Sequence, residues 1–261
     1  MSTLTAPVQE DRAAWHGTRV GRFTASTIGA LMTPPRSKAK AWSDTALTLI
    51  STKAVERLTG QPVQTAANFS MKRGTLLEHA ATYLLSQHWQ PLFSCTWMPI
   101  GDNSGATPDG LLRDGSPVDI KCPESPVSLL EFGDSVPDGD WLALLDWDRT
   151  YAWQIATQAL AAGSDRASLV YFSDRLPWLK WQDEERDTCN AIMSVMGDKL
   201  FTLTTQVYDY HIAPTCEGWA YVARSFEIPQ EAFDQLEEVL QRAEVECLSM
   251  VERYAAILPK R

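Results

Sequence analysis

Two short segments that flank a turn constrain this chain more than any other part of its sequence. The first, residues 106–112, reads Ala-Thr-Pro-Asp-Gly-Leu-Leu, and the second, residues 118–123, reads Val-Asp-Ile-Lys-Cys-Pro. Between them, residues 113–116 read Arg-Asp-Gly-Ser, and Asp-Gly is a residue pair typical of a tight hairpin turn. We therefore expect two antiparallel strands, with Asp109 of the first segment brought close to the second.

The second segment carries an acid and an amine two residues apart. In a strand this spacing places Asp119 and Lys121 on one face, and Ile120 and Cys122 toward the core. With Asp109 one hairpin away, the group suits a metal-dependent hydrolase. Carboxylates bind a hard divalent cation through oxygen, and the lysine positions or deprotonates the attacking water. The alternative is an ordinary turn beside a surface ion pair.

The spacing of these residues resembles the PD-(D/E)xK nuclease signature. Pro-Asp-Gly at 108–110 is followed, about ten residues later, by Asp-x-Lys at 119–121. The Cys-Pro pair directly after it resembles the branch that contains phage lambda exonuclease and the YqaJ-type viral recombinases. The resemblance covers roughly residues 15–175 with gaps. It implies an α/β fold with a restriction-endonuclease-like core, in which a central mixed β-sheet is flanked by helices and the metal site lies at one edge.

The same resemblance implies roles for the hairpin residues. Asp109 would bridge one or two Mg²⁺ ions. Asp119 and the main-chain carbonyl of Ile120 would complete the coordination of the main ion. Lys121 would orient the nucleophilic water and favour its hydroxide form. Mn²⁺ is expected to substitute for Mg²⁺.

Two predicted helices add residues to this site. One contains Arg-Gly-Thr-Leu-Leu-Glu-His-Ala, which resembles the family's Gly-x-x-x-Glu-x-x-Ala helix and makes Glu78 the third acid. The other, residues 149–162, resembles the family's Tyr-x-x-Gln-x-Gln helix. That match carries over Tyr151 as a DNA contact and Gln154 as an active-site residue. Gln158 falls two residues later than the family's second glutamine, which leaves its role open.

The distribution of charge allows a nucleic-acid partner, although the average charge argues against one. The net charge is −10, but residues 1–73 hold ten Lys or Arg against four Asp or Glu, and the remainder holds 13 against 29. A basic N-terminal third can carry phosphate contacts locally. The alternative is a chance fluctuation of solvated surface charge.

The N-terminal third also resembles the opening of the lambda-type exonucleases. Residues 15–32 contain a tryptophan, an arginine and a Thr-Ala-Ser turn at the spacing of that family. The resemblance implies that Arg19 and Ser26 bind the 5′-phosphate of a DNA end. Thr107 takes the place of a serine that completes the family's pocket. A guanidinium suits such a pocket because its planar fork binds phosphate oxygens bidentately.

A basic loop follows this segment. Residues 34–42 read Pro-Pro-Arg-Ser-Lys-Ala-Lys-Ala-Trp, and the family has an arginine in the equivalent loop that reaches into the duplex. Arg36 is the matching residue, and Lys38 and Lys40 are expected to contact the DNA backbone. A solvated basic loop without a ligand is the alternative.

Composition favours one domain. A chain of 261 residues with 44% hydrophobic content can bury one sizeable core, so residues 1–261 are expected to form a single nuclease domain. Residues 183–216 fit the family less well and are interpreted as an insertion that begins as a helix. Residues 229–258 are expected to form a long C-terminal helix, whose apolar stripe indicates core packing or, alternatively, a subunit contact.

Three other segments carry structural predictions. A helix is expected to begin at an Asp44 cap and to end at Gly60. Residues 93–100 are expected to form a strand of the same sheet as the hairpin. Residues 131–148 carry six acids among Pro and Gly and are interpreted as an irregular acidic loop, with a second metal site as the less favoured alternative.

Cysteine usage and hydropathy indicate a cytoplasmic protein. The five cysteines are scattered and form no C-x-x-C pair, which is typical of reduced thiols rather than a zinc or iron–sulfur site. The sequence contains no run of 18 apolar residues and begins without the basic and apolar regions of a secretory signal. No membrane partner is expected. The resemblance implies a phage or prophage origin in a bacterial host cell.

Taken with these residues, the resemblance implies a Mg²⁺-dependent exonuclease. It would degrade double-stranded DNA from 5′ to 3′, starting at DNA ends, and leave 3′ single-stranded overhangs for recombination by strand annealing. It also implies a homotrimer and a single-strand annealing protein as a partner. Two alternatives stay open: a structure- or site-specific endonuclease of the same fold, and a non-catalytic DNA-end-binding protein.

Overall fold

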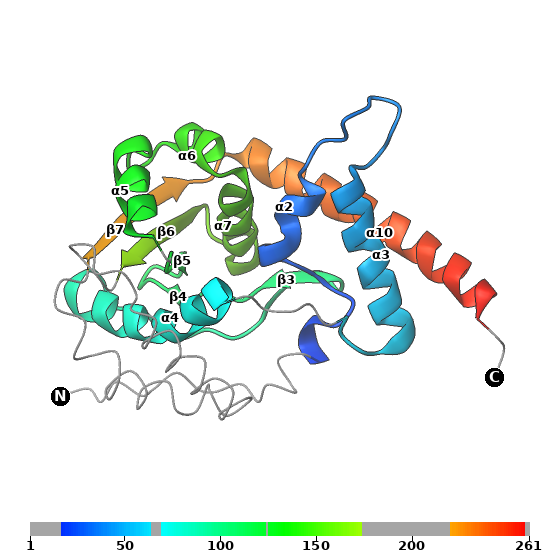
Figure 1. Cartoon of the computed structure of the whole chain (residues 1–261), viewed down its shortest axis with the longest axis horizontal. Coiled ribbons are helices and arrows are strands. Elements are labelled where there is room, and N and C mark those ends of the chain that lie inside the picture. The colour runs from blue at the N-terminus through cyan, green and yellow to red at the C-terminus, as the bar shows by residue number, and fades with distance from the viewer. Residues whose placement is uncertain (1–16, 64–68, 124, 174–219, 259–261) are drawn as a thin grey trace.

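The computed structural model describes residues 17–63, 69–123, 125–173 and 220–258 (Figure 1). The predicted insertion at 183–216 lies outside these residues. In chain order the elements are β1 (Phe23–Thr24), η1 (Ala25–Thr27), α2 (Ile28–Leu31), α3 (Asp44–Thr59), α4 (Phe69–His88), β2 (Met98–Ile100), β3 (Ser104–Ala106), β4 (Gly110–Leu111), β5 (Pro117–Lys121), α5 (Pro126–Ser135), α6 (Trp141–Trp147), α7 (Arg149–Ala162), β6 (Arg166–Ser173), β7 (Ala220–Glu227) and α10 (Gln230–Ile257). None of the helices in these ranges combines the length and hydropathy needed to cross a bilayer.

The predicted hairpin is confirmed and forms one edge of a mixed sheet. β4 pairs antiparallel with β5, and the turn between them closes through a hydrogen bond from the Leu112 N–H to the Ser116 carbonyl, at 2.9 Å. Gly115 occupies the left-handed region of this turn with φ at 87°, a conformation that costs glycine little. β5 runs parallel to β6, and β6 antiparallel to β7, in the order β4-β5-β6-β7.

Helices cover both faces of this sheet. On one face, Tyr171 of β6 stacks on Phe132 of α5, with ring centroids 4.3 Å apart, and α7 packs beside them. On the other face, Val170 packs with Leu85 of α4. Figure 1 shows α7 beside β6, and α4 near the strands of the hairpin. The predicted arrangement of a mixed sheet flanked by helices is therefore confirmed, and α5, α6 and α7 form the connection between the parallel strands β5 and β6.

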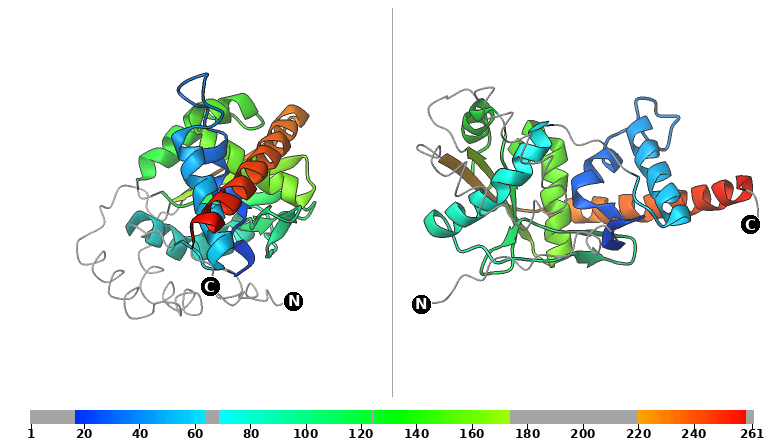
Figure 2. Two further views of the ribbon diagram at one scale, coloured as in Figure 1. Left: turned by 90° about the vertical axis from the view of Figure 1, so that its right-hand side faces the viewer. Right: turned by 60° about the horizontal axis from the view of Figure 1, so that its bottom comes forward.

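The long C-terminal helix packs as its apolar stripe predicts. Leu236, Leu240, Ala243 and Cys247 of α10 are all buried in the same core as α3. Figure 2 shows α10 lying across α3. Burial of each leucine side chain stabilises the fold by about 1.5–3 kcal/mol. The stripe is therefore core packing along most of the helix.

The start of α3 differs by one residue from the prediction. Ser43 is the capping residue, and its hydroxyl accepts a hydrogen bond from the Ala46 N–H at 3.1 Å. Asp44 is instead the first helical residue, where its charge favours the positive end of the helix. Gly60 ends the helix as predicted.

The prediction of one strand over residues 93–100 is wrong in extent and in partner. Only residues 98–100 form a strand, β2, and it belongs to a second sheet with the order β1-β3-β2. Phe93 instead makes one isolated bridge to Leu111 beside the hairpin. The chain thus passes from one sheet to the other between these residues, and local sequence contains no signal for that change of partner.

The prediction of an irregular acidic loop over residues 131–148 is also wrong. This stretch contains the end of α5 and the whole of α6. Asp140 caps α6 by accepting from the Ala143 N–H at 3.0 Å, and Asp148 caps α7 by accepting from the Thr150 N–H at 2.8 Å. Asp138 accepts from the Ser225 N–H of β7 at 2.7 Å. These three acids satisfy main-chain donors, which accounts for them without a metal.

Candidate active site

The hairpin brings the two predicted acids together. The Asp109 N–H donates to the Val118 carbonyl at 3.0 Å, immediately before the first β4–β5 pair, so Asp109 lies beside Asp119. The Asp109 Oδ2 atom accepts a hydrogen bond from the Ile120 N–H at 2.6 Å. Its carboxylate is thereby fixed over the β5 backbone, between Asp119 and Lys121.

Asp119 is buried beneath α7, with only 2% of its surface exposed. Its Oδ1 atom accepts two amide hydrogen bonds from α7, from Gln154 Nε2 at 2.6 Å and from Gln158 Nε2 at 2.8 Å. Its Oδ2 atom lies 2.7 Å from Lys121 Nζ in an ion pair. The carboxylate is therefore held at one oxygen, and the other faces the cation of its own strand.

Lys121 is enclosed by the groups that the sequence analysis assigned to the site. Its Nζ lies 3.2 Å from Gln154 Oε1 and 4.6 Å from the centre of the Tyr151 ring. Burial disfavours the charged amine, but the Asp119 carboxylate, assisted by Asp109, outweighs burial and raises the pKa of Lys121. Lys121 is accordingly an ammonium ion in this arrangement, suited to binding a negative oxygen rather than accepting a proton.

Glu78 of α4 brings a third carboxylate to the cluster. Burial raises the pKa of Asp109 well above its usual range, and the nearby Glu78 and Asp119 carboxylates raise it further. The Lys121 ammonium offsets only part of this rise in the pKa of Asp109. Ionised Asp109 is therefore repelled by its neighbouring acids and only partly compensated by the single ammonium, which is the electrostatic condition that favours a bound cation.

The donor set fits a hard divalent cation in its chemistry. Carboxylates are the ligands that Mg²⁺ and Ca²⁺ prefer, and the Oδ2 atom of Asp119 already faces a cation, the Lys121 ammonium at 2.7 Å. Within the described ranges, no three Asp, Glu, His or Cys side chains lie close enough together to form a complete ligand set. Asp109 and Glu78 face each other, whereas Asp119 is turned toward Lys121. These three acids are the residues that would hold such an ion.

The three residues predicted to bind a 5′-phosphate gather around β1 and β3. These strands run parallel, and Thr24 pairs with Gly105; Ser26 and Thr107 each lie two residues beyond this pair, at the same end. Ser26 is exposed, and the Thr107 hydroxyl is buried without a hydrogen-bond partner. A hydroxyl in that state is available to a ligand or to water.

Arg19 approaches the same strands from the preceding segment. Its guanidinium carbon lies 5.7 Å from the centre of the Trp97 ring, and Trp97 packs directly on Gly105 of β3. A side chain at Gly105 would meet this ring, since its Cβ would lie only 2.5 Å from Trp97 Cζ2. Arg19 is therefore placed at the strand pair that leads to Ser26 and Thr107.

The predicted DNA-binding loop is exposed. Arg36, Lys38 and Lys40 all lie in the exposed connection between α2 and α3, which extends away from the body of the molecule in Figure 1. Lys40 forms an ion pair with Asp44 at 2.8 Å, and both side chains are solvated. Such an exposed pair is worth less than about 1 kcal/mol, so Lys40 can exchange this partner for a phosphate at little cost.

The overall structure is similar to those of exonucleases. The LHK-Exo complex with dAMP aligns over 95% of this chain and 100% of the neighbour, with a TM-score of 0.64 and 22% identity. Another structure of this alkaline exonuclease, from Laribacter hongkongensis, has a TM-score of 0.63 and 21% identity, and also aligns over 95% of this chain and 100% of the neighbour. A phage-related exonuclease from Haemophilus somnus has a TM-score of 0.59 and 18% identity, and aligns over 91% of this chain and 96% of the neighbour. The chain has the alkaline exonuclease fold.

This likeness confirms the fold predicted from the hairpin motif. No protein-family model and no curated protein sequence matches the chain significantly. Similarity to the exonuclease fold is therefore carried by structure and by the short motifs around the site.

Gln158 is the residue of this site that sequence reasoning left open. It is 2% exposed and donates to the same Asp119 oxygen as Gln154. The signal was present, because residues four apart share one face of a helix. In this chain the second glutamine that binds Asp119 thus stands one helical turn after the first, rather than two residues after it.

Proposed function

We propose that the chain is a metal-dependent deoxyribonuclease that degrades double-stranded DNA from 5′ to 3′. The observation that carries the proposal is the group of buried Asp119 with half-buried Asp109 and Lys121, facing Glu78 on an alkaline exonuclease fold. Three acids and one amine on rigid elements match the requirements of phosphodiester hydrolysis. The degradation would leave 3′ single-stranded overhangs.

Each residue of the site has a role in this proposal. A divalent ion, Mg²⁺ or Mn²⁺, would supply charge stabilisation at the attacked phosphate when bound by Asp109, Asp119, Glu78 and the Ile120 carbonyl. The Lys121 ammonium would hold the attacking water and stabilise negative charge on oxygen. Gln154 hydrogen-bonds to both Asp119 and Lys121 and so fixes the carboxylate and the ammonium relative to each other.

The proposed polarity rests on the residues at β1 and β3. Arg19 and the hydroxyls of Ser26 and Thr107 would bind a terminal 5′-phosphate. Each charge-assisted hydrogen bond to the dianion is worth about 1.5–3 kcal/mol. The basic loop, with Arg36, Lys38 and Lys40, would contact the duplex. Tyr151 would contact DNA near Lys121.

A first prediction tests the exonuclease polarity. Linear duplex with a 5′-phosphate is expected to be degraded about tenfold to a hundredfold faster than the same duplex with a 5′-hydroxyl. Arg19→Ala is expected to remove most of that preference and to leave residual cleavage. The measurement is the release of nucleotides from the two substrates under identical conditions. A preference that survives in Arg19→Ala would show that another group reads the phosphate.

Covalently closed circular DNA separates this proposal from the endonuclease alternative. An exonuclease that needs an end leaves closed circles intact, whereas an endonuclease of the same fold cuts them. Cleavage of circles at a rate similar to that of linear duplex would overturn the proposal. The non-catalytic alternative predicts binding to DNA ends without cleavage in Mg²⁺.

A second prediction concerns Gln158. Gln158→Leu removes one of the two amide donors to Asp119, and we expect single-turnover cleavage to fall about tenfold to a hundredfold, from the loss of one charge-assisted bond. Ca²⁺ affinity, measured by calorimetry, is expected to fall as well. Thr157→Val is the matched control, because it deletes a buried hydroxyl bond within α7, to the Trp153 carbonyl, without touching Asp119. Equal losses of cleavage and of Ca²⁺ affinity in both variants would show that Gln158 only supports the packing of α7.

The proposal includes an assembly and a biological setting. A homotrimer would enclose the DNA, and a single-strand annealing protein would receive the 3′ overhang for phage-type recombination. The protein would act in the cytoplasm of a bacterial host. These parts follow from resemblance to the lambda-type exonucleases, and sedimentation analysis with and without DNA tests the first of them.

A further inference from the structure

Both main-chain polar groups of Gly21 are held by side chains of α3. The Gly21 N–H donates to Glu56 Oε2 at 2.9 Å, and the Gly21 carbonyl accepts from Arg57 Nε at 2.7 Å. Gly21 has φ at +70°, and a Cβ atom there would lie 2.5 Å from the Arg57 Cγ atom. Two consecutive residues of α3 thus hydrogen-bond to one turn. The positive φ of that turn and its close approach to Arg57 both require glycine.

The two gripping side chains are themselves anchored. Arg57 makes a bidentate contact with Glu244 of α10, with both nitrogen–oxygen distances at 2.7 Å. Glu56 is 5% exposed and accepts from Lys53 Nζ at 2.8 Å. Planar fork contacts of this kind fix direction as well as distance. The turn at Gly21 is therefore connected to both helices through buried or half-buried ionic groups.

This turn connects the residue predicted to bind the 5′-phosphate to the strand beside it. The Arg22 N–H donates to the Arg19 carbonyl at 3.1 Å, which closes the turn around Gly21. Phe23 then begins β1, and the Arg57 guanidinium carbon lies 6.0 Å from the centre of its ring. A shift of Gly21 would move Arg19 relative to β1 and β3.

Arg57 is poorly placed to bind DNA itself. Its Nε, Nη1 and Nη2 atoms each donate to Gly21 or Glu244, and its side chain is 17% exposed. Its charge is balanced by the Glu244 carboxylate. An effect of Arg57 on a DNA end would therefore be indirect, through the Gly21 turn and the adjoining Phe23 that it contacts.

We propose that Arg57, oriented by Glu244, is a positioning residue for DNA-end recognition: it fixes the Gly21 turn and thereby directs Arg19 toward the terminal phosphate. This inference rests on the proposed 5′-phosphate recognition by Arg19. It assigns to the packing of α3 against α10 a role in substrate selection, in addition to its contribution to the core.

The test compares the ratio of cleavage rates on 5′-phosphorylated and 5′-hydroxyl duplex. Arg57→Lys keeps the charge but cannot contact Gly21 and both Glu244 oxygens at once, and we expect the ratio to fall about tenfold, equivalent to 1.4 kcal/mol. Glu244→Gln keeps the side-chain length and is expected to lower the ratio in the same direction. The rate on 5′-hydroxyl duplex should change less than about twofold, because the metal-binding acids are untouched.

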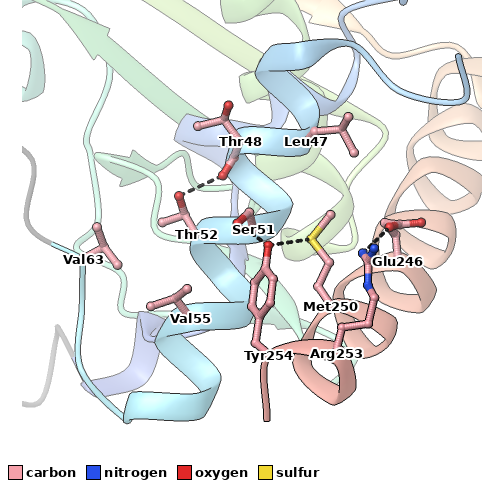
Figure 3. Close-up of a pocket in the computed structure, with 10 residues that line it drawn as sticks. All are labelled: Leu47, Thr48, Ser51, Thr52, Val55, Val63, Glu246, Met250, Arg253 and Tyr254. Carbon is pink, nitrogen blue, oxygen red and sulfur yellow. Dashed lines mark hydrogen bonds and ion pairs between the residues drawn. The ribbon is translucent and has the colours of Figure 1, made fainter. Parts of the chain in front are cut away.

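Tyr254→Phe is the matched control. Tyr254 lines a groove of about 680 Å³ between α3 and α10, and its hydroxyl lies 2.9 Å from Ser51 Oγ (Figure 3). The variant removes a polar contact between the same two helices without touching Gly21, so the ratio should stay unchanged. A matched fall in the control and in Arg57→Lys would indicate general loosening of the helix pair and would overturn the inference.

A double variant completes the test. If Arg57 acts through Arg19, Arg57→Lys should lower the ratio little further once Arg19→Ala is present. An additive loss would overturn the inference. A ratio lowered by Arg19→Ala but unchanged in both Arg57→Lys and Glu244→Gln would overturn it too, and would leave the proposed function standing. A ratio that Arg19→Ala itself leaves unchanged would instead refute the proposed role of Arg19.

Discussion

An Asp109→Asn variant is expected to lose DNA cleavage and, in metal-free buffer, to unfold at a higher temperature than the natural chain. The carboxylate of Asp109 lies among Glu78 and Asp119, and burial with these two acids raises its pKa. A folded-state pKa above the unfolded value destabilises the ionised form at neutral pH, so a neutral amide removes an unfavourable charge. The same charge is required to hold a divalent ion, which explains the loss of activity.

Thermal unfolding in chelator and cleavage in Mg²⁺ are the two measurements. Each kcal/mol of relief corresponds to a rise of roughly 2–4 °C in Tm for a chain of this size. Asp138→Asn is the control, because Asp138 binds a main-chain N–H of β7, two strands away from β5 in the sheet, and the variant should keep its activity. Cleavage at a near-natural rate by Asp109→Asn would refute the site, and a lower Tm would refute the electrostatic account.

A Lys121→Met variant is expected to separate chemistry from binding. The methionine keeps an unbranched side chain but removes the ammonium that pairs with Asp119 at 2.7 Å. We expect turnover to fall by about 10²–10³-fold, the range found when one group that stabilises developing charge is removed. DNA affinity should be nearly unchanged, since one phosphate contact contributes little to a many-contact interface.

The metal-free stability of Lys121→Met should move in the opposite direction to that of Asp109→Asn. Loss of the ammonium leaves the Asp119 carboxylate buried without its ion-pair partner, which costs about 3–5 kcal/mol. DNA binding is measured in Ca²⁺, in which we expect binding without turnover, and cleavage is measured in Mg²⁺ under single-turnover conditions. If affinity and turnover fall in parallel, Lys121 is a backbone contact and not part of the chemistry.

Signals that act over a few residues were sufficient for much of this molecule. Asp-Gly within residues 113–116 predicted the hairpin, and strand alternation placed Asp119 and Lys121 on one face. Gly60 marked the end of its helix. These features were predictable because turns, helix ends and side-chain alternation depend on conformational preferences of adjacent residues.

Errors arose where the partner of a segment lies far away in the chain. Nothing near Phe93 indicates that the following strand joins a different sheet. The acids of residues 131–148 were interpreted from composition, whereas Asp138 and Asp140 bind main-chain N–H groups whose positions depend on the folded helices and on β7. A one-residue choice such as Ser43 over Asp44 depends on which side chain the turn orients toward the helix.

Residue types and their spacing were enough to indicate which residues could form the site and which local elements carry them: Asp109, Asp119 and Lys121 on a hairpin, and Gln154 on a helix. The burial of Asp119, and its binding by both Gln154 and Gln158, depended instead on how the helices pack on the sheet. Those contacts join residues 35 and 39 positions apart. They exist because α7 packs on one face of the sheet and α4 on the other, which removes water from charged groups that would otherwise be solvated.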